Sequence, residues 1–457
     1  MTSRRQFLAT TVASAAAVLA RAQATGSSPK TPNIVLLFAD DLGYGDLACY
    51  GNPVIKTPNL DALAAEGARL TTFYACPACT PSRAALLTGR YPVRPGGVAN
   101  VLGPESETGL PASEITLANA LKAAGYKTKI VGKWHLGHAK PEFMPTSHGF
   151  DEYFGLLYSN DMIKPWVQTD RPLRLYRDTE PIDAPVDQNT LTALYTEEAV
   201  KFIKENRDRP FFLYLPYSMS HLPLGASAEF RGASKGGLYG DVIEELDHSA
   251  GQIIKALRDH GLDDNTLVMW TSDNGPWQST PDRMLQPGPD GLDNKPWHVG
   301  SPGPFRESKG STYEGGVRVP ALFRWPGHIP AGQLIQEMGS TMDILPTALT
   351  AAGVAVPGDR PIDGVNLLPL LQGETSQSPN EVHYYFLGSR LDAVRKGPWK
   401  LQLASGQEEL FQIEQDFEER TNVAADHPDI TAKLRQMLET FAKETDATLP
   451  KPVEPET

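Results

Sequence analysis

The sequence predicts an α/β fold in which a large, mostly parallel sheet is covered by helices, followed by a small C-terminal α+β unit with antiparallel strands. Short β-branched apolar runs alternate with amphipathic helical stretches through most of the chain, which is typical of parallel strands joined by helical crossovers. The run EVHYYFL, which begins at Glu381, then opens a series of short strands that is followed by a helical pattern near 428–445. The 457 residues suffice for one large and one small domain.

The domain boundaries follow from where these patterns stop. We expect the large domain to span 32–371, with TMDILPTALTAAG as one of its last helices, and the C-terminal unit to span 381–447. The polar stretch QGETSQSPNE between them is typical of a linker, and 448–457 is expected to be a disordered tail.

The composition excludes several classes of protein. With 40% hydrophobic and 21% charged residues the chain is neither wholly disordered nor a coiled coil, and no uncharged apolar run reaches the ~20 residues of a membrane span. A formal charge of −13 without a basic block argues against nucleic acid as a partner. The three cysteines, Cys49, Cys76 and Cys79, are too few for a disulfide scaffold and lack zinc-site spacing.

Residues 1–24 have the pattern of an export signal. Arg4 and Arg5 precede a short apolar stretch that ends in the small-x-small sequence Ala22-Gln23-Ala24. The run SRRQFLA resembles the twin-arginine consensus, which predicts export of a folded bacterial protein to the periplasm or beyond, with an ordinary secretory signal as the alternative. The leader carries three arginines and no acid, so its removal would change the formal charge from −13 to −16.

Polar side chains follow four of the predicted strands. They are Asp40 and Asp41 after the strand 33–39, Asp273 and Asn274 after the strand 266–270, Lys133 and His135 in KTKIVGKWHLG, and His221 in RPFFLYLPYSMSHLPL. Because ligands and catalytic groups collect beyond the carboxyl ends of such strands, we expect these side chains to lie together.

The acidic strand ends predict a metal site. Two adjacent aspartates alone are most often a turn or a helix cap, but four oxygen side chains on one rim would repel one another unless a hard divalent cation lay between them. Ca²⁺ suits an all-oxygen cage better than Mg²⁺. No zinc pattern is present, so His135 and His221 are predicted to take part in chemistry rather than in metal binding.

The segment ACPACTPSRAALLTGR predicts a helix with a cysteine at its start. Thr80 suits the N-cap, Pro81 the first helical position and Gly89 the C-cap, so Cys79 should lie immediately before the helix. The helix N-terminus and Arg83, one turn further on, would both attract an anion. A buried structural cysteine is the alternative for Cys79 alone, and a redox CxxC pair is the alternative for Cys76 with Cys79.

These residues also carry a resemblance to a known family. Cys79-Thr80-Pro81-Ser82-Arg83, continued by Leu87-Thr88-Gly89-Arg90, matches the sulfatase signature C-x-P-S-R…TGR. The segments ADDLGYGDLACYGN, GKWHLG, HGFDEYFG, SDNGP and KGSTYEGGVRVPALFRWPG resemble sulfatase segments in the same order. The sequence most resembles the arylsulfatase A and N-acetylgalactosamine-6-sulfatase type. The resemblance implies an alkaline-phosphatase-like sandwich and hydrolysis of sulfate monoesters.

The resemblance also implies a mechanism. Cys79 would be oxidised to formylglycine by a dedicated installing enzyme; one hydroxyl of the hydrated aldehyde would attack sulfur, and loss of a proton from the other would expel sulfate. The implied metal ligands are Asp40, Asp41, Asp273, Asn274 and the modified Cys79. Arg83 would steady the hydrate, Lys133 and His135 would contact the nucleophile with His135 as the base, His221 and Lys309 would bind sulfate and assist the departing oxygen, and Ser159 would touch sulfate. Without the surrounding match, Lys309 would be read as a solvated surface lysine.

The stretch between Asn274 and Lys309 is predicted to form a substrate loop. Twelve of its 34 residues are Gly or Pro, which excludes a helix or a regular strand. Trp277, Trp297 and His298 in this loop could stack on an aryl or sugar ring, with 166–177 as a second wall, although the tryptophans could equally only anchor the loop.

The predicted activity is therefore hydrolysis of small aryl sulfates, with a sulfated carbohydrate as the natural substrate. Two alternatives remain at this point: a phosphomonoester or phosphonate hydrolase, and a sulfated-glycan binding protein without activity.

Overall fold

The computed structural model describes residues 31–451, so the leader predicted at 1–24 and the last residues of the predicted tail lie outside it. From Pro32 onward the described chain forms one compact unit. None of its helices is long and apolar enough to cross a membrane.

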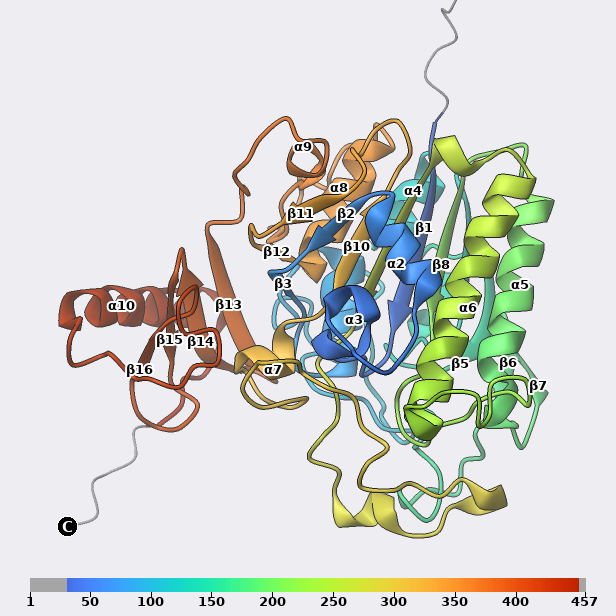
Figure 1. Ribbon diagram of the computed structural model, residues 1–457, viewed down its shortest axis with the longest axis horizontal. Helices are drawn as coiled ribbons and strands as arrows, with labels where there is room; N and C mark the ends of the chain where they lie inside the picture. Colours follow the sequence, from blue (N-terminus) through green and yellow to red (C-terminus); the bar gives the residue numbers. More distant parts are fainter. Residues whose placement is uncertain (1–30, 452–457) are drawn as a thin grey trace, which may run out of the picture. The chain divides into compact units, whose positions relative to one another are not determined.

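A ten-stranded mixed sheet forms the centre of this unit (Figure 1). Its order is β11 (Gln333–Ile335), β2 (Ala68–Leu70), β10 (Ala321–Arg324), β9 (Thr266–Ser272), β1 (Asn33–Ala39), β8 (Phe211–Pro216), β4 (Lys127–Val131), β5 (Glu152–Leu156), β6 (Leu175–Arg177) and β7 (Glu180–Asp183). The five neighbours from β9 to β5 run parallel, and antiparallel pairs occur at β10, β6 and β7. A two-stranded parallel sheet joins β3 (Phe73–Tyr74) to β12 (Gly339–Ser340).

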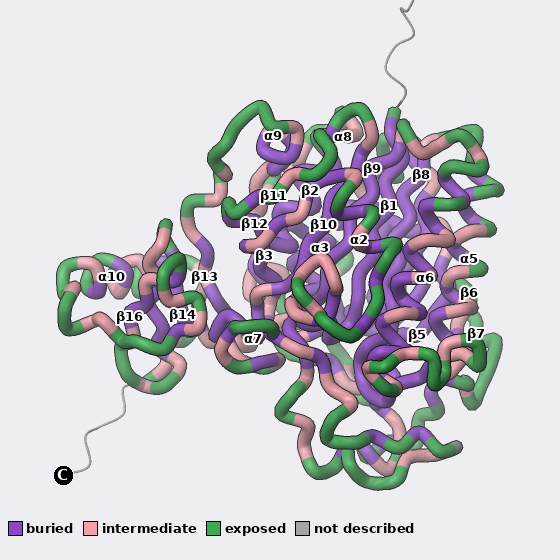
Figure 2. Tube along the Cα trace, in the orientation of Figure 1, coloured by how far each residue is buried: buried purple, intermediate pink, exposed green. Residues whose placement is uncertain are grey.

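Every residue of β1, β8 and β9 is buried, as expected for parallel strands that are covered on both faces (Figure 2). The runs NIVLLFA and TLVMWTS are hydrophobic almost throughout because neither face meets water. The sequence pattern therefore predicted these strands well.

Helices cover both faces because the chain crosses the sheet in both directions. The helices are α2 (Pro58–Ala65), α3 (Cys79–Thr88), α4 (Leu117–Ala123), α5 (Leu191–Glu205), α6 (Gly237–Asp259), α7 (Glu314–Val317), α8 (Ile344–Ala351), α9 (Leu368–Leu371) and α10 (Pro428–Thr445). The chain passes from β2 to β4 through α3 and α4, whereas it returns in the opposite direction from β7 to β8 through α5 and from β8 to β9 through α6. Since such crossovers are right-handed, the two directions place their helices on opposite faces. Accordingly, α2, α5 and α6 pack together, and so do α3, α4 and α8.

The C-terminal unit is a four-stranded antiparallel sheet with one helix. Its strands are β13 (Val382–Leu387), β14 (Arg390–Lys396), β15 (Trp399–Gln402) and β16 (Glu409–Gln412), and α10 packs on β14 and β15. Its hydrophobic core also takes in Ala85, Tyr91 and Met342 from the large domain. The two parts therefore share one packed interface.

The fold class predicted from the sequence is confirmed: a large, mostly parallel sheet with helices, followed by a small antiparallel sheet. In the predicted tail, Thr448 forms backbone hydrogen bonds with Ser389 and Leu391, and Leu449 packs on the C-terminal core. This first part of the tail is thus paired with the C-terminal sheet, and 452–457 lie outside the described residues.

Candidate active site

The four strands that end in polar side chains are immediate neighbours in the sheet. Their order is β9, β1, β8, β4, and all three pairs are parallel. Their carboxyl ends therefore meet at one edge, and β5, next to β4, adds the loop that carries Ser159. The structure thus brings together the polar groups that the sequence pattern placed at strand ends.

Helix α3 presents Cys79 to this edge, although it begins earlier than predicted. It starts at Cys79 itself, with Ala78 as the N-cap, and Gly89 ends it in a left-handed conformation (φ 67°) as expected. Thr80 was predicted to be the N-cap, but its hydroxyl donates to the carbonyl of His135 (3.0 Å) and accepts from the amide of Leu102 (3.2 Å). Thr80 therefore ties two loops together instead of capping the helix.

A buried ion-pair cluster surrounds Asp40. Lys133 Nζ donates to Asp40 Oδ2 at 2.5 Å and to Ser159 Oγ at 3.1 Å. Arg83 Nη2 lies 3.2 Å from Asp40 Oδ2 and 3.0 Å from Asp273 Oδ2. The side chains of Arg83, Asp40, Lys133 and Asp273 are all fully buried. Removing any one of them would leave an uncompensated charge in the interior.

A second cluster joins Asp41 to Cys79 through Lys309. Lys309 Nζ lies 2.7 Å and 2.8 Å from the two carboxylate oxygens of Asp41 and 3.5 Å from Cys79 Sγ. Cys79 Sγ is also 3.7 Å from Asp40 Oδ1. Asn274 Nδ2 donates to Asp41 Oδ1 (2.7 Å). Cys79 is therefore in contact with the acidic end of β1 and with a cationic side chain.

The donor set fits a hard divalent cation. Asn274 Oδ1 is buried without a hydrogen-bond partner among the described residues. Asp40, Asp41, Cys79 and His221 each offer a ligand atom within 4.8 Å of the others. Three carboxylates face three cationic side chains in these clusters, so a divalent cation would give the site a net positive charge that suits an anionic ligand. Asp273 has less capacity left to bind a cation, because both of its carboxylate oxygens already accept hydrogen bonds, one from the amide of Asp41 (3.0 Å) and one from Arg83.

Burial and neighbouring charges shift the acidity of the site. Burial raises the pKa of the Cys79 thiol to about 12 although Lys133 and Lys309 oppose this, so an unmodified Cys79 stays protonated at neutral pH. Burial also raises the pKa of Asp273 to about 7, and Asp40 adds to this by repulsion. Burial alone would raise the pKa of Asp40 too, but Lys133 and Arg83 together hold it below its usual range.

The two cysteines of the CxxC motif do not resemble a redox pair. Burial raises the pKa of both Cys76 and Cys79 to about 12, and both are free thiols. A reactive dithiol needs a lowered pKa. The redox alternative therefore lacks support in the structure.

Both histidines are buried in their neutral form. Burial, with Lys133 and Arg83, lowers the pKa of His135 well below its usual value, and its Nε2 hydrogen-bonds the carbonyl of Leu102 (2.8 Å). His135 Nδ1 has no partner among the described residues, which leaves it able to accept a proton. Burial and Lys309 lower the pKa of His221 to about 3, and its Nε2 lies 3.6 Å from Asp41.

The predicted substrate loop divides into a part inside the site and a part outside it. The indole of Trp277 lies 4.6 Å from Lys309 Nζ and 5.2 Å from the ring of His221. Trp297 is 72% exposed and lines a separate cavity of about 670 Å³ with Tyr239 and Lys235. In the part of the chain that the structure describes, neither Trp297 nor His298 has a hydrogen bond, ion pair or ring contact with the residues around Cys79.

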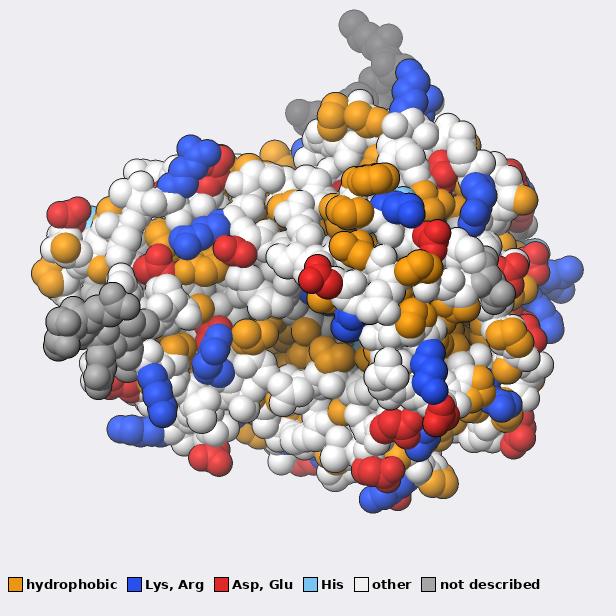
Figure 3. All heavy atoms as spheres, turned by 90° about the horizontal axis from the view of Figure 1, so that it is seen from below, with side chains coloured by type: hydrophobic (Ala, Val, Ile, Leu, Met, Phe, Trp, Pro, Cys, Tyr) orange, Lys and Arg blue, Asp and Glu red, His pale blue; other side chains and the backbone are white. Residues whose placement is uncertain are grey.

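The loop itself has no α-helix or strand among its described residues, as predicted, and contains only short 3₁₀ turns. It packs against the segment that begins at Trp166, which donates to the carbonyl of Gln286 (3.1 Å) and accepts from Arg283 (2.9 Å). Viewed from below (Figure 3), this end of the molecule is hollowed near its middle, with hydrophobic side chains in the hollow. Acidic and basic side chains are scattered around the hollow rather than gathered in one patch.

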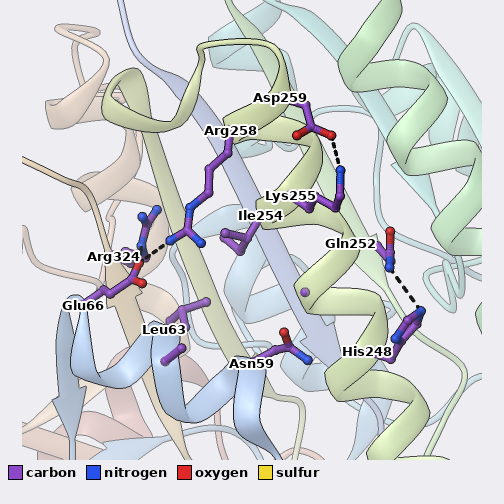
Figure 4. A pocket seen from close by; sticks show the side chains of 12 residues that line it. Asn59, Leu63, Glu66, His248, Gln252, Ile254, Lys255, Arg258, Asp259 and Arg324 are labelled. Carbon is purple, nitrogen blue, oxygen red and sulfur yellow. Dashed lines mark hydrogen bonds and ion pairs between the residues drawn. The ribbon is translucent and has the colours of Figure 1, made fainter.

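A further cavity of about 340 Å³ lies between α2 and α6 (Figure 4). Glu66 pairs there with Arg258 (2.6 Å) and Arg324 (2.7 Å), and Lys255 pairs with Asp259. Each charged side chain that lines this cavity has an ion-pair partner, and none of the lining residues belongs to the clusters around Cys79.

Comparisons with known proteins identify the family. The family described as Sulfatase matches residues 32–354. The chain belongs to the sulfatase family. A second family, described as N-sulphoglucosamine sulphohydrolase, C-terminal, matches residues 307–444 of this sulfatase.

Individual relatives and solved structures agree with this family assignment. N-acetylgalactosamine-6-sulfatase of Homo sapiens is 45% identical over 393 residues, which cover 82% of this chain and 72% of the relative. The crystal structure of the PsFucS1 sulfatase from Pseudoalteromonas sp. superposes with a TM-score of 0.80 at 29% identity over 92% of each chain. The structure of Ps i-CgsB in complex with k-i-k-neocarrahexaose has a TM-score of 0.77 at 30% identity, covering 90% of this chain and 93% of that chain.

Sequence reasoning missed a group of polar residues next to the site of this sulfatase. Thr312 and Glu314, just after Lys309, are buried against Asp392, Lys400, Gln402 and Glu419 of the C-terminal part. The signal that the sequence offered lies in WKLQL, where Lys400 and Gln402 alternate with hydrophobic residues. Such alternation ordinarily predicts that the polar residues lie on a solvent-facing side of a strand.

Proposed function

We propose that this sulfatase hydrolyses small sulfate esters through a formylglycine at position 79, with a sulfated carbohydrate as its natural substrate. The observation that carries the proposal is the surroundings of Cys79: a helix N-terminus, Lys309 at 3.5 Å and Asp40 at 3.7 Å from its sulfur. Because the buried thiol has a pKa of about 12, an unmodified Cys79 would be a poor nucleophile and a soft, uncharged partner for a hard cation.

The surrounding side chains have distinct parts in this proposal. The hydrated aldehyde would supply one hydroxyl that attacks sulfur and another whose deprotonation releases sulfate. Asp40, Asp41, Asp273 and Asn274 would hold a divalent cation, preferably Ca²⁺, which draws negative charge from the sulfate oxygens. Arg83, already fixed between Asp40 and Asp273, would steady the hydrate.

The remaining groups would move protons and hold sulfate. Neutral His135, with its unpartnered Nδ1, is suited to take the proton that releases sulfate. Although burial opposes it, Asp41 raises the pKa of Lys309, which therefore stays charged and can stabilise the departing oxygen together with His221. Lys133 donates to Ser159 Oγ at 3.1 Å, and both side chains would bind a sulfate oxygen.

Several features support a sulfated carbohydrate as the substrate. The relative from Homo sapiens is named for a sulfated sugar, and the Ps i-CgsB structure carries a neocarrahexaose. In this chain, Trp277 offers an aromatic face beside Lys309, and Trp297 and His298 would contact a longer ligand further out. Aromatic faces stack well on the apolar face of a sugar ring.

The proposal also concerns where the protein works. A twin-arginine leader at 1–24 implies a bacterial protein that is folded, loaded with its cation and modified by the installing enzyme before export to the periplasm or beyond.

The test combines a substitution with a mass measurement. Cys79→Ala should reduce hydrolysis of 4-nitrophenyl sulfate to the background rate while the thermal midpoint stays within a few degrees, because one small side chain in a polar site is removed. In active wild-type protein, the peptide that contains position 79 should have the mass of the aldehyde form. Full activity of Cys79→Ala, or of a preparation with only unmodified Cys79, would refute the proposed mechanism.

A further inference from the structure

The segment that carries Lys309 is hydrogen-bonded on one side to the site and on the other side to the C-terminal sheet. On the side of the site, Lys309 N donates to the carbonyl of Pro276 (3.0 Å), two residues after Asn274. Gly310 N donates to the carbonyl of Pro77 (2.8 Å), two residues before Cys79. The segment has little structure of its own, since α7 is a single turn. Its position must therefore be fixed by what it packs against.

On its other side, the segment is fixed by the C-terminal sheet. Lys400 Nζ, from β15, donates to the carbonyl of Thr312 (2.9 Å) and to Glu314 Oε1 (3.0 Å). The Thr312 hydroxyl donates to Asp392 Oδ2 of β14 (3.2 Å) and accepts from Gln402 Nε2 of β15 (3.1 Å). Backbone and side chain of Thr312 are thus both bonded to the C-terminal unit.

A buried charge closes this network. Glu419 Oε1 lies 2.8 Å from Lys400 Nζ, and Glu419 Oε2 accepts from the amide of Glu314 (2.7 Å). The side chains of Lys400, Glu314 and Glu419 are all 0% exposed. Burying three charges costs free energy that an apolar contact would not cost, so the network is weak evidence for stability and favours a role in geometry.

The backbone on both sides of Lys309 packs closely against Gly315 and Gly316 of α7. A Cβ on Gly316 would lie 2.0 Å from the carbonyl oxygen of Ser311, and one on Gly315 would lie 2.1 Å from that of Glu307. A shift at Thr312 or Glu314 would therefore be passed along the backbone to Lys309, whose Nζ is 3.5 Å from Cys79 Sγ.

We infer that Lys400 and Glu419 are positioning residues: the C-terminal sheet, through their contacts with Thr312 and Glu314, sets where Lys309 meets the reacting group. This inference rests on the role proposed above for Lys309. It assigns to the C-terminal unit, beyond packing, an effect on the rate of sulfate ester cleavage that is exerted through the position of Lys309.

The experiment measures kcat and KM with 4-nitrophenyl sulfate in purified enzyme whose conversion at position 79 is verified by peptide mass. Lys400→Met keeps most of the side-chain volume and removes the charge. We expect kcat to fall on the order of 10- to 100-fold with KM within about 3-fold, because displacements near 1 Å can cost about 100-fold in rate. Glu419→Gln keeps an acceptor for the Glu314 amide, so its kcat should fall less than that of Glu419→Ala.

A double-mutant comparison separates positioning from general damage. If Lys400 acts through Lys309, Lys400→Met should slow the Lys309→Ala enzyme by less than about 2-fold. If Lys400→Met lowered kcat by the same factor in wild type and in the Lys309→Ala enzyme, the inference would be overturned. Leu438→Ala, which truncates the C-terminal core without touching Thr312 or Glu314, is the matched control and should lower the thermal midpoint but leave kcat unchanged.

Two further outcomes remain distinguishable. Should Lys400→Met fail to fold, Thr312→Val removes the hydroxyl hydrogen bonds to Asp392 and Gln402 from the other side of the interface. Its effect on kcat should likewise nearly disappear in the Lys309→Ala background. Additive effects of Thr312→Val and Lys309→Ala on kcat would count against the inference equally. Full activity of Lys309→Ala would instead refute the proposed role of Lys309, and the inference with it.

Discussion

Asn274 shows how one side chain can reveal the chemistry of a site. Its amide nitrogen is used, donating to Asp41, whereas its buried oxygen has no partner among the described residues. An unpaired buried acceptor costs about 1–3 kcal/mol, so it marks a position where something else binds. With three carboxylates nearby, that partner is expected to be a cation rather than a hydrogen-bond donor.

Replacing Asn274 tests this expectation independently of turnover. Asn274→Leu keeps the approximate shape and removes the oxygen, so the affinity for the cation should fall by about tenfold or more, whereas Asn274→Asp should retain it. The metal content, measured by elemental analysis, should be about one equivalent in wild type and lower in Asn274→Leu. EDTA should lower the thermal midpoint of wild type more than that of Asn274→Leu. Equal metal content in all three proteins would exclude Asn274 as a ligand.

The loop between Asn274 and Lys309 is an element whose two tryptophans have different surroundings. Trp277 contacts Lys309 and His221, and Trp297 stands in the solvent beside another cavity. The sequence could place both in one loop but could not tell them apart, because the path of a loop without repeating structure depends on long-range packing such as that with Trp166.

The two tryptophans should therefore differ in their kinetics. Trp277→Ala should lower kcat on every sulfate ester by about 2- to 30-fold, since a cation–π contact is worth about 0.5–2 kcal/mol. Trp297→Ala should leave 4-nitrophenyl sulfate hydrolysis unchanged and raise KM only for a sulfated oligosaccharide. Comparing both variants on both substrates measures this. Identical profiles for wild type and Trp297→Ala on the oligosaccharide would remove Trp297 from substrate binding.

Strand β13 attaches the C-terminal sheet to the large domain through a buried histidine. The ring of His383 stacks on Tyr74 at 4.9 Å and meets Tyr385 edge-on at 4.7 Å. Burial lowers the pKa of His383 to about 3; Glu314 opposes this shift, and Lys400 and Arg395 add to it. The folded protein therefore holds this ring neutral, whereas the unfolded chain binds a proton near pH 6.5.

This depressed pKa predicts acid sensitivity at the element level. The stabilising contribution is complete above about pH 6.5 and is lost as the pH falls towards 3, by about 1.4 kcal/mol for each pH unit. His383→Phe keeps an aromatic ring that cannot be protonated, so its stability should fall less between pH 7.5 and pH 5 than that of wild type. Urea unfolding at both pH values measures this, with His328→Phe at an exposed position as control. An equal loss in wild type and His383→Phe would contradict the prediction.

At the scale of the whole molecule, sequence reasoning succeeded where a pattern repeats locally. The all-buried strands β1, β8 and β9 read as continuous apolar runs, and the polar residues behind them could be placed on one edge by topology alone. Lys400 and Gln402 show the opposite case. Their alternation with Leu401 and Leu403 predicts a solvent face, but the C-terminal sheet buries that face against the segment of Lys309. Contacts between distant segments leave no local pattern in either one.

A twin-arginine leader, as proposed for 1–24, would determine what state the whole molecule must reach before export. If the pair Arg4 and Arg5 selects a route for folded proteins, the aldehyde and the cation are installed in the cytoplasm. Replacing both arginines with lysine should therefore leave active enzyme in the cytoplasm, measured as 4-nitrophenyl sulfate hydrolysis in cytoplasmic and periplasmic fractions. Arg21→Lys, outside the pair, is the matched control and should be exported normally. Unchanged periplasmic activity of the double variant would favour the ordinary secretory route, in which the chain crosses the membrane unfolded and would acquire its cation only afterwards.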